Sequence, residues 1–323
     1  MEKMMRAVVI QEFGDPSGMA IIEVPVPTPE ANHALIRVEA IGVGGVDAVI
    51  RRGTLGASFP IGMVPGSEVS GTVVAVGENV DPSWIGRRVW AFTGTDGGYA
   101  ELAVALASEL VPLPAALTSI EAVTLGSAAT VAHFALAHAH FSAGESVLVR
   151  GAAGSIGIAT VELARRGGAK VVAVTTSSVD RGRKLRKLGA TEVLDRAGKG
   201  DSIISESFDV IIDVVGGADV PAFMDRLAPN GRMILVGAVA GFPPADFGTR
   251  LTQAFQQSRS FATFSLASIP TEQRDAARID MFEAATRGEL HPAIHAVMPL
   301  DQAPEAHRQM DLGVVFGRIV LTP

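Results

Sequence analysis

A glycine turn between an apolar strand and an apolar helix constrains the fold of this chain more than any other segment. The turn is Gly151–Gly157, with the sequence Gly-Ala-Ala-Gly-Ser-Ile-Gly, and a helical pattern follows over residues 155–166. Gly154 lets backbone approach a pyrophosphate, Gly157 allows close helix–strand packing, and the first N–H groups of the helix can hold phosphate oxygens. The turn predicts a dinucleotide site, although Ala152 replaces the usual first glycine. A purely structural glycine turn is the alternative.

The residues around this turn alternate between strand and helix patterns. The strand patterns are apolar throughout, which is typical of a parallel sheet covered by helices on both faces. They cover residues 146–150, 170–175, 192–194, 209–215 and 232–237, and the helix patterns between them cover 155–166, 181–188 and 220–227. The fold class is therefore α/β, with a doubly wound parallel-sheet domain expected over residues 121–264.

The chain before this domain is rich in short strands separated by prolines and glycines. Strand patterns cover residues 6–10, 20–24, 33–40, 71–76 and 88–91, which favours a β-barrel or sandwich-like unit. Thr118 and Glu121 form a capping box, so a helix is expected to begin there. Near the end, strands over 292–297 and 318–321 and a short helix over 304–309 resemble the beginning. We expect residues 265–323 to complete a first domain of residues 1–120.

Composition excludes several functions. The chain has no cysteine, so it has no disulfide, thiolate-bound zinc, iron–sulfur cluster or cysteine nucleophile. Its net charge of −7 gives no basic excess for a nucleic-acid partner. Residues 122–143 carry no Asp, Glu, Lys or Arg, but their Ser, Thr and His residues favour a buried helix over a membrane span. With no targeting pattern at the start, a cytoplasmic location is expected.

The residues after the strand over 170–175 predict which dinucleotide binds. In NAD sites an Asp or Glu at this strand tip binds the ribose hydroxyls. Here the tip continues with Thr176, Ser178 and Arg181, which can donate to a 2′-phosphate that a carboxylate would repel. The pattern favours NADPH. Two alternatives remain open, because Asp180 can face the ribose and Arg181 can be an exposed cation.

Several sequence blocks together carry a family resemblance over essentially the whole chain. They are residues 5–9, 40–47, 64–71, 97–101, 144–148, 151–157, 188–190, 229–232 and 316–321. The chain resembles the medium-chain dehydrogenase/reductase superfamily, in its zinc-free quinone oxidoreductase branch that includes ζ-crystallin. The resemblance implies a GroES-like catalytic domain and a Rossmann NADP-binding domain, with the active site in the cleft between them. It also implies a homodimer formed through the edge of the Rossmann sheet.

The turn, the strand tip and the resemblance together give the candidate site residues. The expected cofactor contacts are Gly151, Ala152, Gly154, Ser155, Ile156, Gly157, Thr176, Ser178, Arg181, Arg196, Val215, Gly216, Gly237, Phe264, Leu266 and Arg318. Arg196 is either a second phosphate cation or an exposed arginine. Asp47 occupies an active-site position of the family, where it positions substrate or nicotinamide, and a turn-capping aspartate is the alternative. Thr130 or Arg52, with backbone N–H groups, would hold the negative charge that develops on the acceptor's oxygen.

Departures from zinc-dependent relatives predict a site without metal. Those relatives place a Cys where this chain has Gly44 or Gly45, and a His where it has Ser67. His291 and His295 have a spacing of four, but Pro292 interrupts the helix that would align them. The tyrosines that quinone reductases often carry after the Asp47 position are replaced by Ala48, Val49 and Leu55, which predicts a more apolar pocket.

These observations favour one function and leave two alternatives. The favoured function is an NADPH-dependent quinone oxidoreductase that transfers a hydride to a quinone-like acceptor without zinc. The alternatives are an NADPH-dependent enoyl or alkenal reductase, acting on α,β-unsaturated carbonyl compounds, and a non-catalytic NADPH-binding protein. The expected partners are a small electron-poor acceptor, either a quinone or an enone, and a second copy of the chain. Nucleic acid and membrane are not expected partners.

Overall fold

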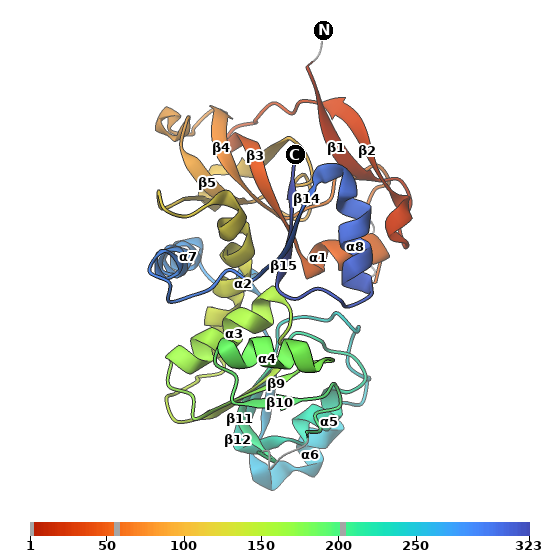
Figure 1. Ribbon diagram of the computed structural model, residues 1–323, viewed down its shortest axis with the longest axis vertical. Helices are drawn as coiled ribbons and strands as arrows, with labels where there is room; N and C mark the ends of the chain where they lie inside the picture. Colours follow the sequence, from red (N-terminus) through yellow and green to blue (C-terminus); the bar gives the residue numbers. More distant parts are fainter. Residues whose placement is uncertain (1–2, 55–58, 201–204) are drawn as a thin grey trace. The chain divides into compact units, whose positions relative to one another are not determined.

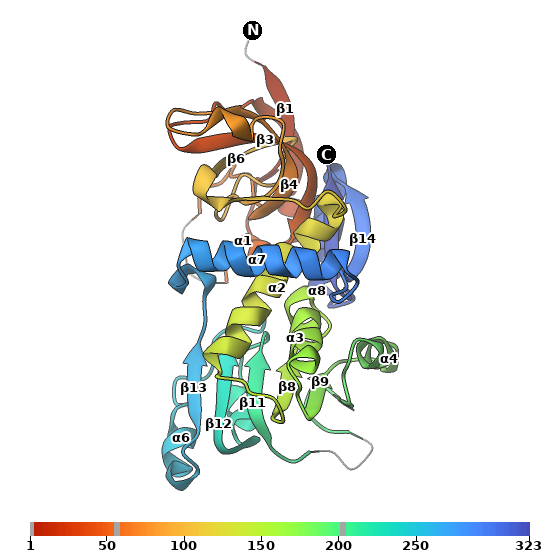
Figure 2. The ribbon, with the colours of Figure 1, turned by 90° about the vertical axis from the view of Figure 1, so that its left-hand side faces the viewer.

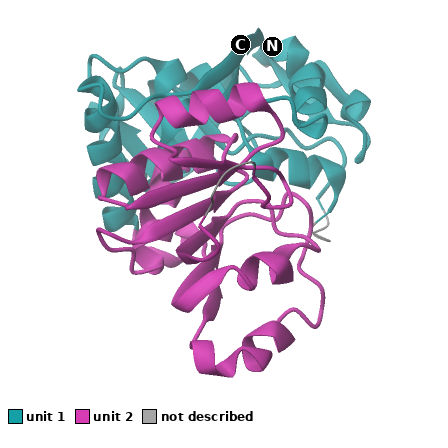
Figure 3. Ribbon diagram, turned by 60° about the horizontal axis from the view of Figure 1, so that its bottom comes forward, with its two compact units in different colours: residues 1–127, 271–323 teal, residues 128–270 magenta. Residues whose placement is uncertain are grey.

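The structure is a computed structural model that describes residues 3–54, 59–200 and 205–323, and the chain forms two compact units (Figure 3). The first unit consists of residues 1–127 and 271–323, and the second consists of residues 128–270. The boundary at Ser127 lies inside one long helix, α2 (Ser119–His138).

The first unit is built on a seven-stranded, mainly antiparallel sheet (Figure 1). Its strand order is β14-β15-β3-β4-β5-β7, and β6 pairs with β3. The strands are β3 (His33–Val43), β4 (Glu68–Val76), β5 (Arg88–Phe92), β6 (Leu102–Leu106), β7 (Leu110–Pro112), β14 (Ile294–Pro299) and β15 (Arg318–Thr322). β15 pairs antiparallel with β3, so the expected return of the C-terminal strand to the first domain is confirmed.

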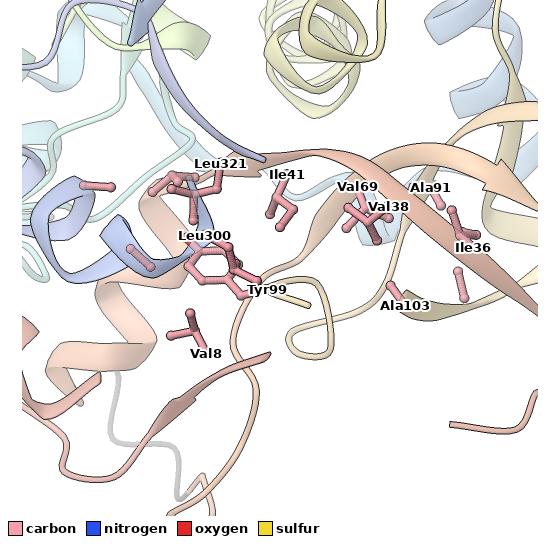
Figure 4. Close-up of a cluster of buried hydrophobic side chains, with 14 of the residues drawn as sticks. Val8, Ile36, Val38, Ile41, Val69, Ala91, Tyr99, Ala103, Leu300 and Leu321 are labelled. Carbon is pink, nitrogen blue, oxygen red and sulfur yellow. The ribbon is translucent and has the colours of Figure 1, made fainter. Parts of the chain in front are cut away.

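A two-stranded ribbon, β1 (Met4–Ile10) with β2 (Met19–Pro25), completes the β structure of this unit. Its Val8 joins a core cluster that also holds Ile41, Leu300 and Leu321, and Figure 4 shows the Tyr99 ring among these side chains. Burial of this apolar surface stabilises the unit by roughly 25 cal/mol per Å² removed from water. The core therefore joins strands from both ends of the chain.

Besides α2, the described part of this unit contains the α-helices α1 (Gly45–Arg52), α7 (Thr271–Thr286) and α8 (Ala303–Asp311). The pattern over 304–309 predicted α8, whereas α1 and α7 were not predicted. α1 has only eight residues and begins at a glycine, so it carries little helical periodicity. It ends at Gly53, whose φ of 67° is the left-handed conformation that favours glycine at a helix C-terminus.

Helix α2 begins where its capping box predicted. The Thr118 N–H donates to Glu121 Oε2 at 2.9 Å, and the Glu121 N–H donates to Thr118 Oγ1 at 3.2 Å. Among the described residues, α2 alone has the length and apolar composition that crossing a membrane requires. However, 61% of its most apolar stretch is buried inside the protein. Its apolar composition is thus weak evidence for a membrane.

The second unit is a six-stranded parallel sheet of order β10-β9-β8-β11-β12-β13. Figure 2 shows β13, β12, β11, β8 and β9 side by side. The strands are β8 (Ser146–Arg150), β9 (Val171–Thr175), β10 (Glu192–Leu194), β11 (Phe208–Asp213), β12 (Leu227–Leu235) and β13 (Ser260–Thr263), with helices α3 (Ser155–Arg166), α4 (Val179–Lys187), α5 (Val220–Met224) and α6 (Thr249–Gln253). The chain enters at β8, runs out to β10 and returns to β11. The strand order therefore reverses between β8 and β11, where such sheets bind ligands.

Two predicted boundaries in this unit were wrong. β11 ends at Asp213 and not at residue 215, because the Asp213 carboxylate accepts the N–H groups of Val215 and Gly216 and bends the chain out of the sheet. The helix expected over 220–227 ends at Met224, and β12 begins as early as Leu227. α6 and the edge strand β13 were not predicted.

Candidate cofactor site and active-site residues

The glycine turn after β8 has the close packing that its sequence predicted. A Cβ added to Gly157 would lie 2.6 Å from Ala152 Cα, and one added to Gly151 would lie 2.8 Å from Val215 Cγ2. Gly154 is different, because its Cβ would approach only Gly151 O, at 4.0 Å. The turn is therefore packed tightly on its protein side and open at Gly154.

Helix α3 begins directly after this open glycine. Its N-cap residue is Gly154, and no side chain caps the helix. The N–H groups of Ser155, Ile156 and Gly157 thus begin a helix whose positive dipole end has no side-chain acceptor. This geometry fits the pyrophosphate of a dinucleotide.

The tip of β9 supplies hydroxyl groups beside the turn. Thr175 Oγ1 accepts the Gly151 N–H at 3.1 Å, which ties the turn to β9. The next residue, Thr176, is 8% exposed, and among the described residues its buried Oγ1 has no hydrogen-bond partner. A buried hydroxyl without a partner is costly, so Thr176 fits a site completed by a bound polar ligand.

Helix α4 and its N-cap place Arg181 and Ser178 after β9, and Arg196 follows the neighbouring strand β10. Ser178 is the N-cap, its Oγ accepts the Arg181 N–H at 3.2 Å, and Arg181 Nη1 donates to Ser177 Oγ at 3.2 Å. Desolvation lowers the pKa of Arg181, and the positive charge of Arg196 lowers that pKa further. Two neighbouring cations favour an anion between them. Arg196 is exposed, so both roles considered for it, a second phosphate cation and an exposed arginine, stay open.

Asp180 points along its own helix. Its carboxylate lies 3.3 Å from Lys184 Nζ and 3.9 Å from Arg183 Nη1, one turn further on. Asp180 thus has two cationic neighbours on the exposed face of α4, which supports the NADPH interpretation over a ribose-binding carboxylate.

The remaining cofactor candidates of the second unit follow β11, β12 and β13. The Val215 and Gly216 N–H groups donate to Asp213 Oδ1 at 2.8 and 3.1 Å. A Cβ on Gly237 would lie 2.5 Å from Val214 O, so the chain segments after β11 and β12 approach closely. Phe264 donates its N–H to Leu235 O at 3.0 Å, and Leu266 begins a short 3₁₀ turn. All these residues lie at the carboxyl ends of parallel strands, which share one edge of the sheet.

In the first unit Asp47 is fully buried and caps helix α1. Its Oδ2 accepts the Gly44 N–H at 2.7 Å, and its Oδ1 accepts the Ser67 hydroxyl at 3.2 Å. Burial raises the pKa of Asp47 to about 6, against the opposing effects of the Gly44 hydrogen bond and the charge of Arg318. The alternative role, a capping aspartate, is therefore present in the structure.

A chain of buried groups, which sequence reasoning missed, ends at Asp47. Tyr99 Oη lies 3.0 Å from His307 Nε2 and 3.4 Å from Asp47 Oδ2. Arg51 Nε donates to His307 Nδ1 at 3.4 Å, so the Nε2 of the neutral ring carries the proton. His307 then donates to Tyr99, and Tyr99 donates to Asp47. Burial lowers the pKa of His307 to about 3, which keeps the ring neutral.

The other two predicted catalytic residues are engaged or buried. Arg52 Nε donates to Asp311 Oδ1 at 2.9 Å, and Asp311 also binds Arg51. Thr130 is fully buried in the part of α2 that belongs to the second unit. The Arg52 guanidinium thus has a carboxylate partner already, which weakens its predicted role in holding charge on an acceptor.

Arg318 belongs to the first unit and has an internal partner. Its Nη2 donates to Glu68 Oε2, and the residue is 6% exposed. The guanidinium packs against Gly42, where a Cβ would lie 2.6 Å from Nη2. Among the described residues, Arg318 Nε has no hydrogen-bond partner. The Nη2 group of Arg318, a predicted cofactor contact, is therefore already bound to Glu68.

The positions expected to replace zinc ligands have other roles. Gly44 and Ser67 both donate to Asp47, as described above. His295 lies in β14, where its Nδ1 accepts the Phe316 N–H at 3.2 Å. Within the described ranges, no group of three or more His, Cys, Asp or Glu residues is placed to hold a metal ion. Ala48 and Val49 are buried in α1, and Leu55 lies outside the described residues.

Comparisons with known proteins agree with the fold. Residues 30–115 match the family described as an alcohol dehydrogenase GroES-like domain, and residues 188–321 match a family described as a zinc-binding dehydrogenase. The quinone oxidoreductase of Mus musculus is 33% identical over 96% of this chain and 95% of its own length. That of Homo sapiens is 32% identical over 99% and 98%.

Solved structures are similar over the whole chain. A mycobacterial protein, Rv1454c, solved in complex with NADPH, has a TM-score of 0.90 and 29% identity, covering 99% of this chain and 100% of its own. The quinone oxidoreductase of Coxiella burnetii has a TM-score of 0.85 and 26% identity, with coverages of 99% and 100%. The fold and the glycine turn thus define an oxidoreductase enzyme that depends on a nicotinamide cofactor. The chain belongs to the medium-chain dehydrogenase/reductase superfamily, in its ζ-crystallin-like quinone oxidoreductase branch.

Proposed function

We propose that this enzyme is an NADPH-dependent quinone oxidoreductase that works without zinc. The observation that carries the choice of NADPH is the placement of two cations, Arg181 in α4 and Arg196 after β10, where the charge of Arg196 lowers the pKa of Arg181. Ser178 is the N-cap beside Arg181. The names of the relatives from Mus musculus and Homo sapiens support a quinone-type acceptor, and the NADPH complex of Rv1454c supports the cofactor.

The chemistry of the bound cofactor is transfer of one hydride from C4 of its nicotinamide ring. A quinone that accepts this hydride and one proton from solvent becomes a hydroquinone, so the two electrons and both hydrogens balance, and NADP⁺ remains. The role of the protein is to bind the cofactor and to orient it. The first turn of α3 would hold the pyrophosphate, and Ser178, Arg181 and Arg196 would hold the 2′-phosphate. Asp47 fixes the start of α1 through the Gly44 N–H.

Arg181→Ala is expected to raise the KM for NADPH about 10-fold to 100-fold, because a charge-assisted hydrogen bond contributes roughly 1.5–3 kcal/mol. The KM for NADH, which has no 2′-phosphate, should change less than about 3-fold on the same grounds. The measurement is the loss of NADPH absorbance with benzoquinone or 9,10-phenanthrenequinone. Arg183→Ala is the matched control, because that side chain is 70% exposed and pairs with Asp180.

Equal effects of Arg181→Ala on both cofactors would remove the assignment of the 2′-phosphate site. An alkenal serves as a third acceptor. Turnover of the alkenal alone would favour the enoyl or alkenal reductase. Tight NADPH binding without oxidation by any acceptor would support a non-catalytic protein.

Zinc independence rests on the ligands that the chain offers. It has no cysteine, and the Gly44 N–H and the Ser67 hydroxyl both donate hydrogen bonds to Asp47. A structural or catalytic zinc needs three or four nitrogen, sulfur or carboxylate ligands. Metal analysis of the purified enzyme is therefore expected to find no stoichiometric zinc, and activity should survive a chelator. One zinc per chain would overturn this part of the proposal.

The assembly and domain limits remain part of the same proposal. β13 is one of the two edge strands of the parallel sheet, and Phe255, five residues before it in the chain, is 82% exposed. An open strand edge beside an exposed aromatic side chain supports a homodimer through this edge. We retain domains of residues 1–120 with 265–323 and of residues 121–264. A cytoplasmic location, without membrane or nucleic-acid partners, stays a prediction.

A further inference from the structure

We infer that Arg150, paired with Asp213 inside the second unit, positions the loop Val214–Gly217 for the nicotinamide half of the cofactor. The inference rests on the proposed binding of NADPH. Arg150 is the last residue of β8 and directly precedes the glycine turn, and Asp213 is the last residue of β11. The two are partners across the sheet register.

The pair is buried and closely hydrogen-bonded. Arg150 Nη1 donates to Asp213 Oδ2 at 2.9 Å, and the two residues are 3% and 0% exposed. Burying two charges is costly, and the cost is offset only when further hydrogen bonds satisfy them. The remaining side-chain bonds of this pair lead to the loop Val214–Gly217, apart from one bond of Arg150 Nη2 to Asp219 Oδ2 at 3.4 Å.

The pair binds both backbone polar groups of Gly216. The Gly216 N–H donates to Asp213 Oδ1 at 3.1 Å, and the Gly216 carbonyl accepts Arg150 Nη1 at 2.8 Å. Gly216 and Gly217 have φ of 68° and 75°, so this loop adopts a left-handed backbone that only glycine takes at low cost. Glycines are flexible in the unfolded chain, and the buried pair restricts the loop to one conformation.

This loop contacts the neighbouring segments of the cofactor edge. Val215 Cγ2 is the atom that a Cβ on Gly151 would meet, at 2.8 Å, so loop and glycine turn are packed together. On its other side, Val215 O accepts the Ala240 N–H and Gly217 donates to Gly241 O, each at 2.8 Å. The loop follows β11, at the reversal of strand order between β8 and β11, where open parallel sheets bind ligands. The proposed 2′-phosphate residues follow β9, on the other side of β8, so the loop is on the side left for the nicotinamide half.

Arg150 itself is held in one orientation. Its guanidinium carbon lies 4.4 Å from the centroid of the Phe223 ring, and Nη2 lies 3.4 Å from Asp219 Oδ2. A planar fork that stacks on a ring and donates in two directions is specific to arginine. Arg150 is thus a positioning residue, which acts on the cofactor through Gly216.

The test compares Arg150→Met with the double variant Arg150→Met, Asp213→Asn. The single variant leaves the Asp213 charge buried alone, so its Tm should fall. Asparagine keeps an acceptor for Val215 and Gly216 but removes the charge, so the double variant should recover most of the Tm. It still lacks the donor to the Gly216 carbonyl. We therefore expect its Kd for NADPH, measured by fluorescence titration, to stay about 10-fold weaker than in the wild type.

Adenosine 2′,5′-bisphosphate separates positioning from general damage. This probe has the 2′-phosphate and adenosine but no nicotinamide half, so its Kd in the double variant should stay within about 2-fold of the wild type. Arg226→Met is the matched control. Its guanidinium also stacks on a phenylalanine, 5.0 Å from the Phe208 centroid, but it binds Gly198 O and Ser205 O. It should lower the Tm without changing the NADPH Kd.

Two results would overturn the inference: a double variant that binds NADPH as tightly as the wild type, or equal weakening of NADPH and the bisphosphate. Failure of the proposed function has a different signature. In that case the wild type itself would prefer NADH or ignore the 2′-phosphate, and the same comparison would then be made with NADH as the probe.

Discussion

Glu68→Ala is expected to lower the free energy of unfolding of the first unit by about 3–5 kcal/mol, the cost of removing one partner of a buried ion pair. Glu68 is 1% exposed, and its Oε2 accepts Arg318 Nη2. Its Oε1 accepts the Trp90 indole N–H at 2.6 Å and the Ser127 N–H of α2 at 2.9 Å. Alanine would leave all three donors without this acceptor.

The effect should be large because the surrounding charges are buried as well. Arg318 Nε already lacks a partner among the described residues. The guanidinium carbon of Arg278 lies 3.9 Å from the Trp90 ring centroid, and Arg278 is 1% exposed. Loss of Glu68 would thus leave a net positive charge in the core, and water cannot reach it without disrupting the packing.

Denaturant unfolding of the variants measures this loss. Glu101→Ala is the control, since its ion pair with Arg6 joins side chains that are 36% and 52% exposed and should contribute less than about 1 kcal/mol. The double variant Glu68→Gln, Arg318→Met removes both charges and should recover most of the stability. A loss below about 1 kcal/mol for Glu68→Ala would contradict this account of the core.

The sequence predicted what local patterns determine. The glycine turn and the Thr118–Glu121 capping box depend on residues within one turn, and both were found where expected. The alternation of strands and helices was also found, with two boundaries wrong and with α6 and β13 not predicted. The short strand β10 (Glu192–Leu194) was also predicted with its observed bounds. These signals come from backbone geometry and periodicity, which a short window of sequence contains.

The buried polar networks could not be predicted in the same way. Tyr99 and His307 are 208 positions apart in the chain, and Arg150 and Asp213 are 63 apart. Their contacts depend on strand order and on the return of the C-terminal segment, which no local spacing encodes. Arg150 directly precedes the glycine turn, so that position was a usable signal. Its partner became visible only with the sheet register.

His307→Gln is expected to make the protein markedly less sensitive to acid. His307 has a pKa of about 3 in the folded protein, against 6.5 when unfolded, because burial and the charge of Arg51 disfavour its protonated form. Below pH 6.5 the unfolded chain therefore binds a proton that the folded chain does not. The stability that comes from the neutral ring is present above pH 6.5 and is lost progressively as pH falls toward 3.

The size of this loss follows from linkage. Between pH 7 and pH 5 the His307 contribution falls by about 2 kcal/mol, since one pKa unit corresponds to roughly 1.4 kcal/mol. Glutamine does not titrate. Its carbonyl can accept the Arg51 Nε–H and its amide can donate to Tyr99, so the hydrogen bonds of the neutral ring are kept. The variant should lose about 2 kcal/mol less than the wild type over this interval.

Asp47 changes the stability with pH in the opposite direction to His307, so it serves as the comparison. Its pKa is about 6 in the folded protein and 3.8 when unfolded, so its contribution to stability rises as pH falls from 6 toward 3.8. Asp47→Asn removes that gain and should make the protein about 1.3 kcal/mol more sensitive to the change from pH 7 to pH 5. Urea unfolding at both pH values measures both variants.

The opposite signs make the test decisive. Across the window where both groups titrate, roughly pH 4 to 6, the contributions of His307 and Asp47 oppose each other in the wild type. When either group is removed, the pH dependence of the stability shows the contribution of the other group alone. If His307→Gln and Asp47→Asn shifted the acid sensitivity in the same direction, the neutral His307–Tyr99–Asp47 chain described for the folded protein would be wrong. The direction of donation that it implies, from Arg51 toward Asp47, would be wrong with it.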